Sequence, residues 1–246
     1  METAPVIVFD WICRHMPLAD TASVRRTCKR LRWAGLGPEL HWHWRLSHAQ
    51  SLALYMHDLR DVILARGTSI HTLSLRSTFV TDVSMLGNVH TLYLSRTNVR
   101  DVSALHSVHT LELDGTNVEN ASMLGNVVNL DLTTTKVKDA SKLGNVRCLS
   151  LWDSKVTDVS MLGNVHELNL TCTHVVDVSM LGNVHTLILR ASLVTDVSML
   201  GNVHILDLSR TNVTDVSTLD NVKILTLPTG ETVVRKCRKR CRLCVL

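Results

Sequence analysis

Histidine and aspartate residues recur at intervals of 19 positions along this chain, and both residue types can bind metal ions or transfer protons. Imidazole nitrogens are common zinc ligands, and carboxylate oxygens bind hard cations. The histidines are His71, His90, His109, His166, His185 and His204, and the aspartates are Asp82, Asp101, Asp139, Asp158, Asp177, Asp196 and Asp215. Each set could therefore be a metal site or a structural feature.

The residues that interrupt the two sets favour structural roles. Val128, Arg147 and Lys223 occupy the histidine position, so we predict a partly exposed structural ladder there, with a zinc site as the alternative. Stacked carboxylates should repel one another. We therefore predict that each aspartate accepts backbone N–H bonds or caps a short turn, with a cation-binding stripe as the alternative. The sequence has no glycine-rich phosphate loop, H-E-x-x-H or nucleophile motif, so we predict neither an enzyme nor a cofactor.

The interval reflects a 19-residue unit that repeats from Ile70 to about Thr229. A fixed period whose apolar positions never drift indicates a solenoid, because one unit cannot bury its apolar face alone. Two leucines per unit alternate with other residues, which is the periodicity of a strand. The pairs are Leu73/Leu75, Leu92/Leu94, Leu111/Leu113, Leu130/Leu132, Leu149/Leu151, Leu168/Leu170, Leu187/Leu189, Leu206/Leu208 and Leu225/Leu227.

Nine such units predict nine short strands in one parallel sheet. Nineteen residues leave too little room for a full helix. The return limb of each coil should therefore be extended or a brief 3₁₀ turn, with Val99, Val102 and Leu105 facing inward in one unit.

The pattern L-x-x-V-x-x-L-x-L-x-x-T-x-V-x-D-V-S-x-L resembles the leucine-rich repeat, most closely its internalin-type variant. The resemblance covers about 160 residues and implies a solenoid with its parallel sheet on the concave face. The unit is shorter than the family's usual 20–29 residues. Hydroxyl residues replace the family's stacked asparagine, and a hydroxyl ladder could take its place. These are Thr97, Thr116, Thr135, Ser154, Thr173, Ser192 and Thr211.

Positions that vary between units flank the strand leucines and should face the concave side. Exposed tryptophan and arginine are typical of binding hot spots. The predicted target-binding patch comprises Tyr93, Arg96, Glu112, Asp114, Asp131, Trp152 and Arg190. The alternative is that these residues vary by neutral drift on a solvated face that binds no target.

Residues 1–46 differ from the repeats and hold four of the five tryptophans. Apolar spacing predicts a first helix ending near Pro17, a second from about Asp20, and a third from Pro38 through Leu46. The segments from Ala4 to Asp20 and from Val24 to Arg32 resemble the F-box. The resemblance implies binding to a Skp-type adaptor through Pro5, Val8, Ile12, Met16, Val24 and Cys28. The alternative is a helical cap that seals the first repeat.

Two further segments complete the predicted organisation. Residues 47–69 look like a linking and capping helix, and residues 230–246 form a basic, cysteine-rich tail. The tail could be palmitoylated at Cys237, Cys241 and Cys244, could be a nuclear localisation signal or weak RNA-binding patch, or could be a disordered solubilising segment. The net charge of +4 lies mostly in this tail, which argues against a specific nucleic-acid binder.

The chain is thus predicted to be an α+β protein: an F-box-like segment (1–46), a linker (47–69), a nine-coil leucine-rich-repeat solenoid (70–229) and a tail (230–246). By resemblance, it would be the substrate receptor of a Skp–cullin–F-box ubiquitin ligase that presents an unidentified target protein. The alternative is a leucine-rich-repeat scaffold without a ligase role, with membrane contact through the tail as a weaker option. The odd set of seven cysteines and the lack of a signal-peptide pattern predict an intracellular protein, cytoplasmic or nuclear and not secreted.

Overall fold

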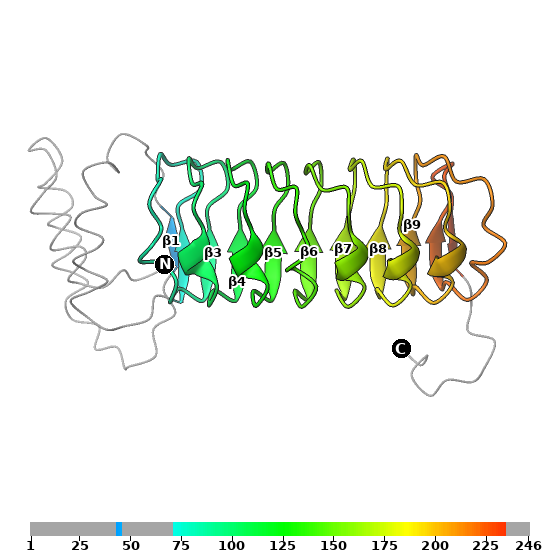
Figure 1. Cartoon of the computed structure of the whole chain (residues 1–246), viewed down its shortest axis with the longest axis horizontal. Coiled ribbons are helices and arrows are strands. Elements are labelled where there is room, and N and C mark those ends of the chain that lie inside the picture. The colour runs from blue at the N-terminus through cyan, green and yellow to red at the C-terminus, as the bar shows by residue number, and fades with distance from the viewer. Residues whose placement is uncertain (1–42, 46–70, 235–246) are drawn as a thin grey trace, which may run out of the picture.

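A computed structural model describes residues 43–45 and 71–234 of the chain, and these form an elongated stack of coils (Figure 1). One eleven-stranded sheet runs the length of the stack in sequence order, with β1 to β10 parallel and β11 antiparallel to β10. The strands are β1 (His43–Arg45), β2 (Thr72–Ser74), β3 (Thr91–Tyr93), β4 (Thr110–Glu112), β5 (Asn129–Asp131), β6 (Cys148–Ser150), β7 (Glu167–Asn169), β8 (Thr186–Ile188), β9 (Ile205–Asp207), β10 (Ile224–Thr226) and β11 (Thr232–Val234).

The 19-residue period places equivalent residues of successive coils side by side. Leu92 of β3 pairs in register with Leu73 of β2 and with Leu111 of β4. All three side chains are at most 1% exposed. Repetition of this register builds one continuous leucine and valine core, so each coil buries its apolar face against its neighbours.

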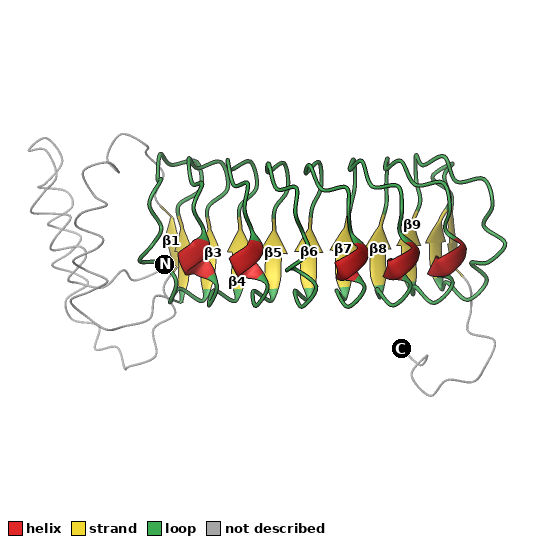
Figure 2. Ribbon diagram, viewed as in Figure 1, coloured by secondary structure: helices red, strands yellow, loops and turns green. Residues whose placement is uncertain are grey.

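The return limbs are extended segments interrupted by short 3₁₀ turns, as the sequence predicts (Figure 2). The turns are η1 (Ser103–Leu105), η2 (Ser122–Leu124), η3 (Ser160–Leu162), η4 (Ser179–Leu181) and η5 (Ser198–Leu200). In η1 the Leu105 amide donates to the Val102 carbonyl at 2.9 Å. The inward prediction for Val99, Val102 and Leu105 is confirmed, since all three are buried. Among the described residues, no helix is long and apolar enough to span a membrane.

Buried hydroxyl groups support the turn that follows each strand. The Thr97 hydroxyl donates to the Leu94 carbonyl three residues earlier, at 2.7 Å. The same bond occurs at Thr78, Thr116, Thr135, Thr173 and Thr211. The column of hydroxyl residues suggested by the sequence therefore bonds to the backbone, but each bond lies inside its own coil and not between coils. Two serines of the column depart from this pattern. The Ser154 hydroxyl instead accepts a bond from the Val156 amide at 3.5 Å, and the Ser192 hydroxyl is buried without a hydrogen-bond partner.

The turn also places one residue per coil in the left-handed region. Positive φ angles occur at Arg96 (57°) and Ala191 (53°), and at Gly115 (66°), where glycine removes the steric cost. The backbone N–H of each such residue then bonds to the next coil, as from Arg96 to the Asp114 carbonyl at 2.7 Å. The left-handed conformation is strained for residues other than glycine, but it positions the backbone N–H to complete the hydrogen-bond ladder between coils.

A column of glycines brings neighbouring return limbs close together. A Cβ added at Gly163, Gly182 or Gly201 would lie 2.5, 2.6 or 2.8 Å from a carbonyl oxygen of the next coil. Real Cβ atoms essentially never come this close to oxygen. Glycine at these positions therefore lets neighbouring limbs approach closely, although His106 and Asp220 occupy the same position in two other coils.

The sheet differs from the nine predicted strands at both ends. Residues 43–45 form β1, parallel to β2 with Trp44 opposite Leu73, so the predicted helix from Pro38 through Leu46 is wrong at these residues. Strand β11 lies at the other end, where Val233 pairs with Leu225. Both strands pair with backbone groups that the terminal coils would otherwise leave open. The rest of the predicted F-box-like segment and linker, and the tail from residue 235, lie outside the described residues.

Candidate protein-binding surface

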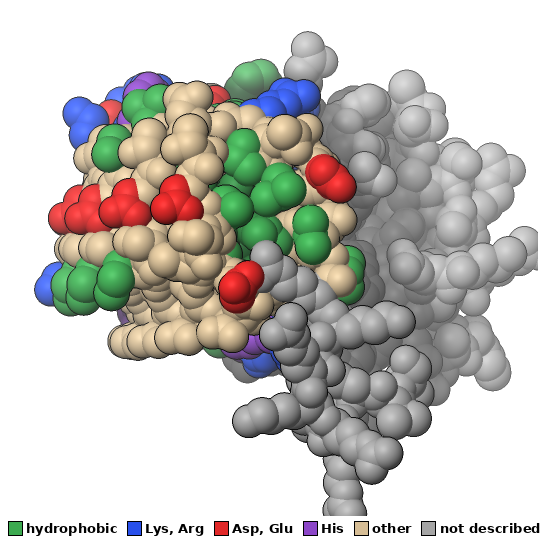
Figure 3. All heavy atoms as spheres, turned by 90° about the vertical axis from the view of Figure 1, so that its right-hand side faces the viewer, with side chains coloured by type: hydrophobic (Ala, Val, Ile, Leu, Met, Phe, Trp, Pro, Cys, Tyr) green, Lys and Arg blue, Asp and Glu red, His purple; other side chains and the backbone are tan. Residues whose placement is uncertain are grey.

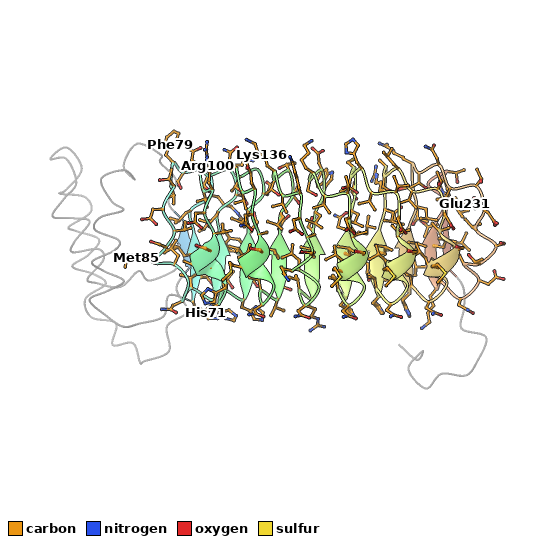
Figure 4. The ribbon with its side chains drawn as sticks, viewed as in Figure 1. His71, Phe79, Met85, Arg100, Lys136 and Glu231 are labelled. Carbon is orange, nitrogen blue, oxygen red and sulfur yellow. The ribbon has the colours of Figure 1, made fainter. Side chains whose placement is uncertain are left out.

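The candidate surface is the sheet face away from the core, called here the open face. In each repeat strand the central leucine is buried and a flanking residue is at least partly accessible, as at Leu92 beside Tyr93. Three residues of the predicted target-binding patch lie in strands on this face, namely Tyr93 in β3, Glu112 in β4 and Asp131 in β5. The other four follow a strand within three residues: Arg96 after β3, Asp114 after β4, Trp152 after β6 and Arg190 after β8. Other residue types occupy the edges: in Figure 4, Phe79, Arg100 and Lys136 lie along one long edge and His71 along the opposite one.

In the N-terminal part of the open face, the polar side chains already interact with one another. Arg76 forms an ion pair with Glu112 across the intervening strand β3, and Ser95 also donates to the Glu112 carboxylate. The Arg76 guanidinium carbon lies 4.1 Å from the centre of the Tyr93 ring, a cation–π contact. Hydrogen bonding to Glu112 raises the pKa of Arg76 above its ordinary value. Tyr93 and Glu112 are thus already engaged within the chain, through an arginine that the predicted patch omits.

The central part of the open face contains a shallow hollow of about 320 Å³ over strands β4 to β8. Glu112, Asp131, Glu167 and Ile188 are among its lining residues. One Asp131 carboxylate oxygen accepts bonds from the Thr133 amide at 2.9 Å and the Thr133 hydroxyl at 2.5 Å. These bonds hold Asp131 in place, and its second oxygen has no hydrogen bond among the described contacts. The hollow therefore combines a fixed acid with apolar surface.

The same arrangement recurs along the face, although the repeat pattern did not predict it. Asn169 accepts from the amide and the hydroxyl of Thr171 at 3.0 and 2.6 Å. Asp207 accepts from the Ser209 amide at 2.8 Å. An acid or amide two residues before a hydroxyl residue, at the end of a strand, is the sequence signal for this local bond.

The remaining patch residues lie at the turn edge of the open face. Trp152 lies two residues after the end of β6 and is 47% exposed, although tryptophan is a large apolar residue. Arg190 is exposed after β8, and Arg96 is exposed after β3. The Asp114 carboxylate accepts a bond from the Thr134 hydroxyl at 3.0 Å. Thus Trp152 and Arg190 present side chains that the chain leaves accessible.

The repeated aspartates act on the backbone, as predicted. The Asp101 carboxylate accepts the Ser103 amide at 2.9 Å, at the start of η1, and Asn120 does the same for Ser122. The bond recurs at Asp82, Asp139, Asp158, Asp177, Asp196 and Asp215. The backbone hydrogen bond lowers the pKa of six of these carboxyl groups: Asp101, Asp139, Asp158, Asp177, Asp196 and Asp215. Each aspartate therefore begins a return turn.

The repeated histidines stack their rings, which confirms the predicted ladder. Centroid distances are 4.6 Å for His71–His90 and 4.4 Å for His90–His109. They are 4.6 Å for His166–His185 and 4.5 Å for His185–His204. Burial lowers the pKa of His90 and His204, and neighbouring positive charges add to the effect. Within the described ranges, no group of three or more histidine, cysteine or acidic residues could hold a metal ion.

Comparison with known proteins supports the fold. No family model matches the sequence, and no curated protein matches it. Internalin C2 from Listeria monocytogenes is 28% identical with a TM-score of 0.55, over 68% of this chain and 90% of that one. The chain folds as a leucine-rich-repeat solenoid.

Two other solved structures share the fold at lower identity. An internalin F from Listeria monocytogenes is 23% identical, with a TM-score of 0.53 over 61% of this chain and 51% of that one. A leucine-rich-repeat protein from Leptospira interrogans is 19% identical, with a TM-score of 0.51 over 64% and 54%. The resemblance to the leucine-rich repeat inferred from the repeat pattern is thus supported at the level of the fold.

Proposed function

We propose that this leucine-rich-repeat protein binds a partner protein on its open face. The exposed Trp152, beside the strand that crosses the central hollow, is the observation that carries the proposal. Positions that vary between coils gather on this face, whereas the leucine, valine, glycine and aspartate positions maintain the stack. A variable surface on a rigid repeated frame suits recognition better than catalysis.

The chemistry of the face indicates what the partner must offer. Trp152 provides apolar area, Asp131 a fixed carboxylate, and Arg190 an exposed cation. A partner would bury the indole and pair a basic group with Asp131. Arg76, Glu112 and Tyr93 already interact with one another. We therefore expect this network to contribute to the shape of the binding surface more than to the free energy of binding.

The test compares two substitutions in one coil of the full chain. A partner captured by the wild-type chain would be titrated against Trp152→Ala and against Lys155→Ala, which alters an exposed residue outside the patch. Loss of a buried tryptophan anchor typically costs about 2 kcal/mol, or roughly thirtyfold in Kd. Lys155→Ala is expected to bind as the wild type does. Equal affinity of Trp152→Ala and wild type would remove the proposed surface.

We further propose that the chain is the substrate receptor of a Skp–cullin–F-box ubiquitin ligase inside the cell. The support is the F-box resemblance of residues 1–46, whose adaptor-binding candidates lie outside the described residues. The receptor would act by proximity: holding a target near the ligase raises the effective concentration of its lysines. No catalytic residue is needed in this chain.

Co-purification with a Skp-type adaptor tests the ligase role. The full chain is compared with a chain lacking residues 1–42, which keeps the β1 residues that pair with β2. The full chain is expected to retain the adaptor and the shortened chain to lose it, while both bind the partner. Absence of adaptor from the full chain would leave a binding scaffold without a ligase role.

A further inference from the structure

The return-limb face carries two parallel stripes that the proposed binding face does not use. Met161, Met180 and Met199 are 60, 62 and 62% exposed in three successive coils. Three residues before each methionine lies an exposed aspartate of the repeated column, and Asp215 extends that column by one coil. Figure 3 shows a row of acidic side chains running along the solenoid, with a row of apolar side chains near it. These residues are called here the Met–Asp stripe.

The Met–Asp stripe is continuous only in the C-terminal half of the solenoid. In the preceding coils Ala104 and Lys142 interrupt the methionine column, and Asn120 interrupts the aspartate column. Each aspartate serves the turn of its own coil, whereas only here does a methionine occur in three successive coils. Exposed methionines form an adaptable apolar surface, and the carboxylates beside them favour a ligand that is both basic and apolar.

The chain itself contains such a ligand directly after the last strand. Residues 235–246 hold six basic residues, with cysteines, leucines and a valine between and after them. Strand β11 runs antiparallel to β10 and places Val234 opposite Ile224, the first residue of β10. The chain therefore leaves the sheet at the edge where each return limb enters its strand. Each methionine of the stripe lies on a return limb, shortly before that edge.

The tail is long enough to cover the stripe. The tail begins after β11, and Met161 lies in the limb that leads into β7, four strand spacings away, or about 19 Å along the axis at ~4.8 Å per strand. Twelve residues extend up to about 40 Å. The excess length allows the tail to cross from the sheet edge to the return-limb face.

We propose that residues 235–246 dock on the Met–Asp stripe of their own chain. The tail's basic residues pair with Asp158, Asp177, Asp196 and Asp215, and its apolar residues cover Met161, Met180 and Met199. Docking shields both the methionines and the tail cysteines. Partners or membranes that compete for the basic tail would uncover the stripe.

The test uses the full chain with methionine methyl groups labelled with ¹³C, observed by NMR. One variant neutralises the tail with Arg238→Gln, Lys239→Gln and Arg240→Gln. A matched control removes the same charge elsewhere, with Lys136→Gln, Lys138→Gln and Lys155→Gln at exposed positions outside the stripe. Met123 is the internal reference, because Lys142 separates it from Met161.

Docking predicts that tail neutralisation shifts the methyl signals of Met161, Met180 and Met199, with Met123 and the lysine control unchanged. Raising the salt concentration from about 0.01 M to 1 M should shift the same signals in the same direction, because it screens the charge pairs. Identical signals in wild type and the tail variant would overturn the proposal. Shifts that grow with protein concentration would also overturn it, since they would place the tail on a second copy.

Discussion

The glycine column predicts a measurable cost for adding a single methyl group. In Gly163→Ala the new Cβ would lie 2.5 Å from the Met180 carbonyl oxygen. An ordinary carbon–oxygen contact is about 3.3 Å or longer, so the limbs must separate by nearly 1 Å. Leu162 and Leu181 pack on either side and would lose contact. Overpacking of this kind costs about 1–3 kcal/mol, partly offset by the roughly 0.4–1 kcal/mol gained from a less flexible unfolded chain.

Urea unfolding of the full chain, followed by far-ultraviolet circular dichroism, measures this cost. We expect Gly163→Ala to unfold with a free energy about 1–2 kcal/mol below that of the wild type. Asn164→Ala is the matched control, because Asn164 is the exposed neighbour and such surface changes usually stay within about 0.5 kcal/mol. His106 occupies the same column position in another coil, so the variant is expected to fold. A Gly163→Ala chain as stable as wild type would refute the idea that the close contact between the limbs at Gly163 excludes a Cβ atom.

Four further predictions concern the turns and the two repeated polar columns. Ser192→Thr should stabilise the chain by about 1 kcal/mol in urea unfolding, because threonine could donate to the Leu189 carbonyl as its equivalents do; no gain would contradict this. Ala191→Gly should stabilise by roughly 0.5–1 kcal/mol in thermal unfolding, since its φ is 53°, and a loss of stability would exclude strain there. Burial lowers the pKa of His90, so the unfolded chain binds that proton more tightly and stability should fall as the pH drops below about 6.5. The pKa of Asp158 is also lowered, but aspartate is charged when deprotonated. Its contribution to the stability of the folded chain is therefore full above about pH 4 and is lost as the pH falls through the lowered pKa. Urea midpoints between pH 8 and 3 measure both losses, and an identical profile for His90→Gln would argue against the first.

The repeat made most of the solenoid predictable, because a fixed period forces equivalent residues into register. The strand leucines, the inward Val99 and the aspartate bonds at the return turns all follow from it. Strand β1 could not be predicted in this way, because residues 43–45 lie outside the period, in a segment around Trp42 and Trp44 whose apolar spacing predicted a helix. Its pairing is decided by the open edge of β2, which local sequence does not reveal.

Individual contacts on the open face were less predictable than the face itself. The pairing of Arg76 with Glu112 joins residues 36 positions apart and crosses β3. Comparison of equivalent positions in the repeats placed both residues on one face, but it could not show that their long side chains meet. The positive φ of Arg96 was also hidden, since only Gly115 signals this conformation by residue type. Thus the period predicts position, whereas pairing depends on side-chain reach.

Site-specific photo-crosslinking tests the central claim, that the open face binds the partner. A photoreactive phenylalanine derivative would replace Ser150, which lines the hollow, or Lys136 on an outer edge, in separate full-length chains. Each chain would be irradiated with the captured partner and the crosslinked product measured by mass spectrometry. We predict crosslinks from position 150 and none from position 136. Crosslinks from position 136 alone would place the binding surface elsewhere and contradict the account.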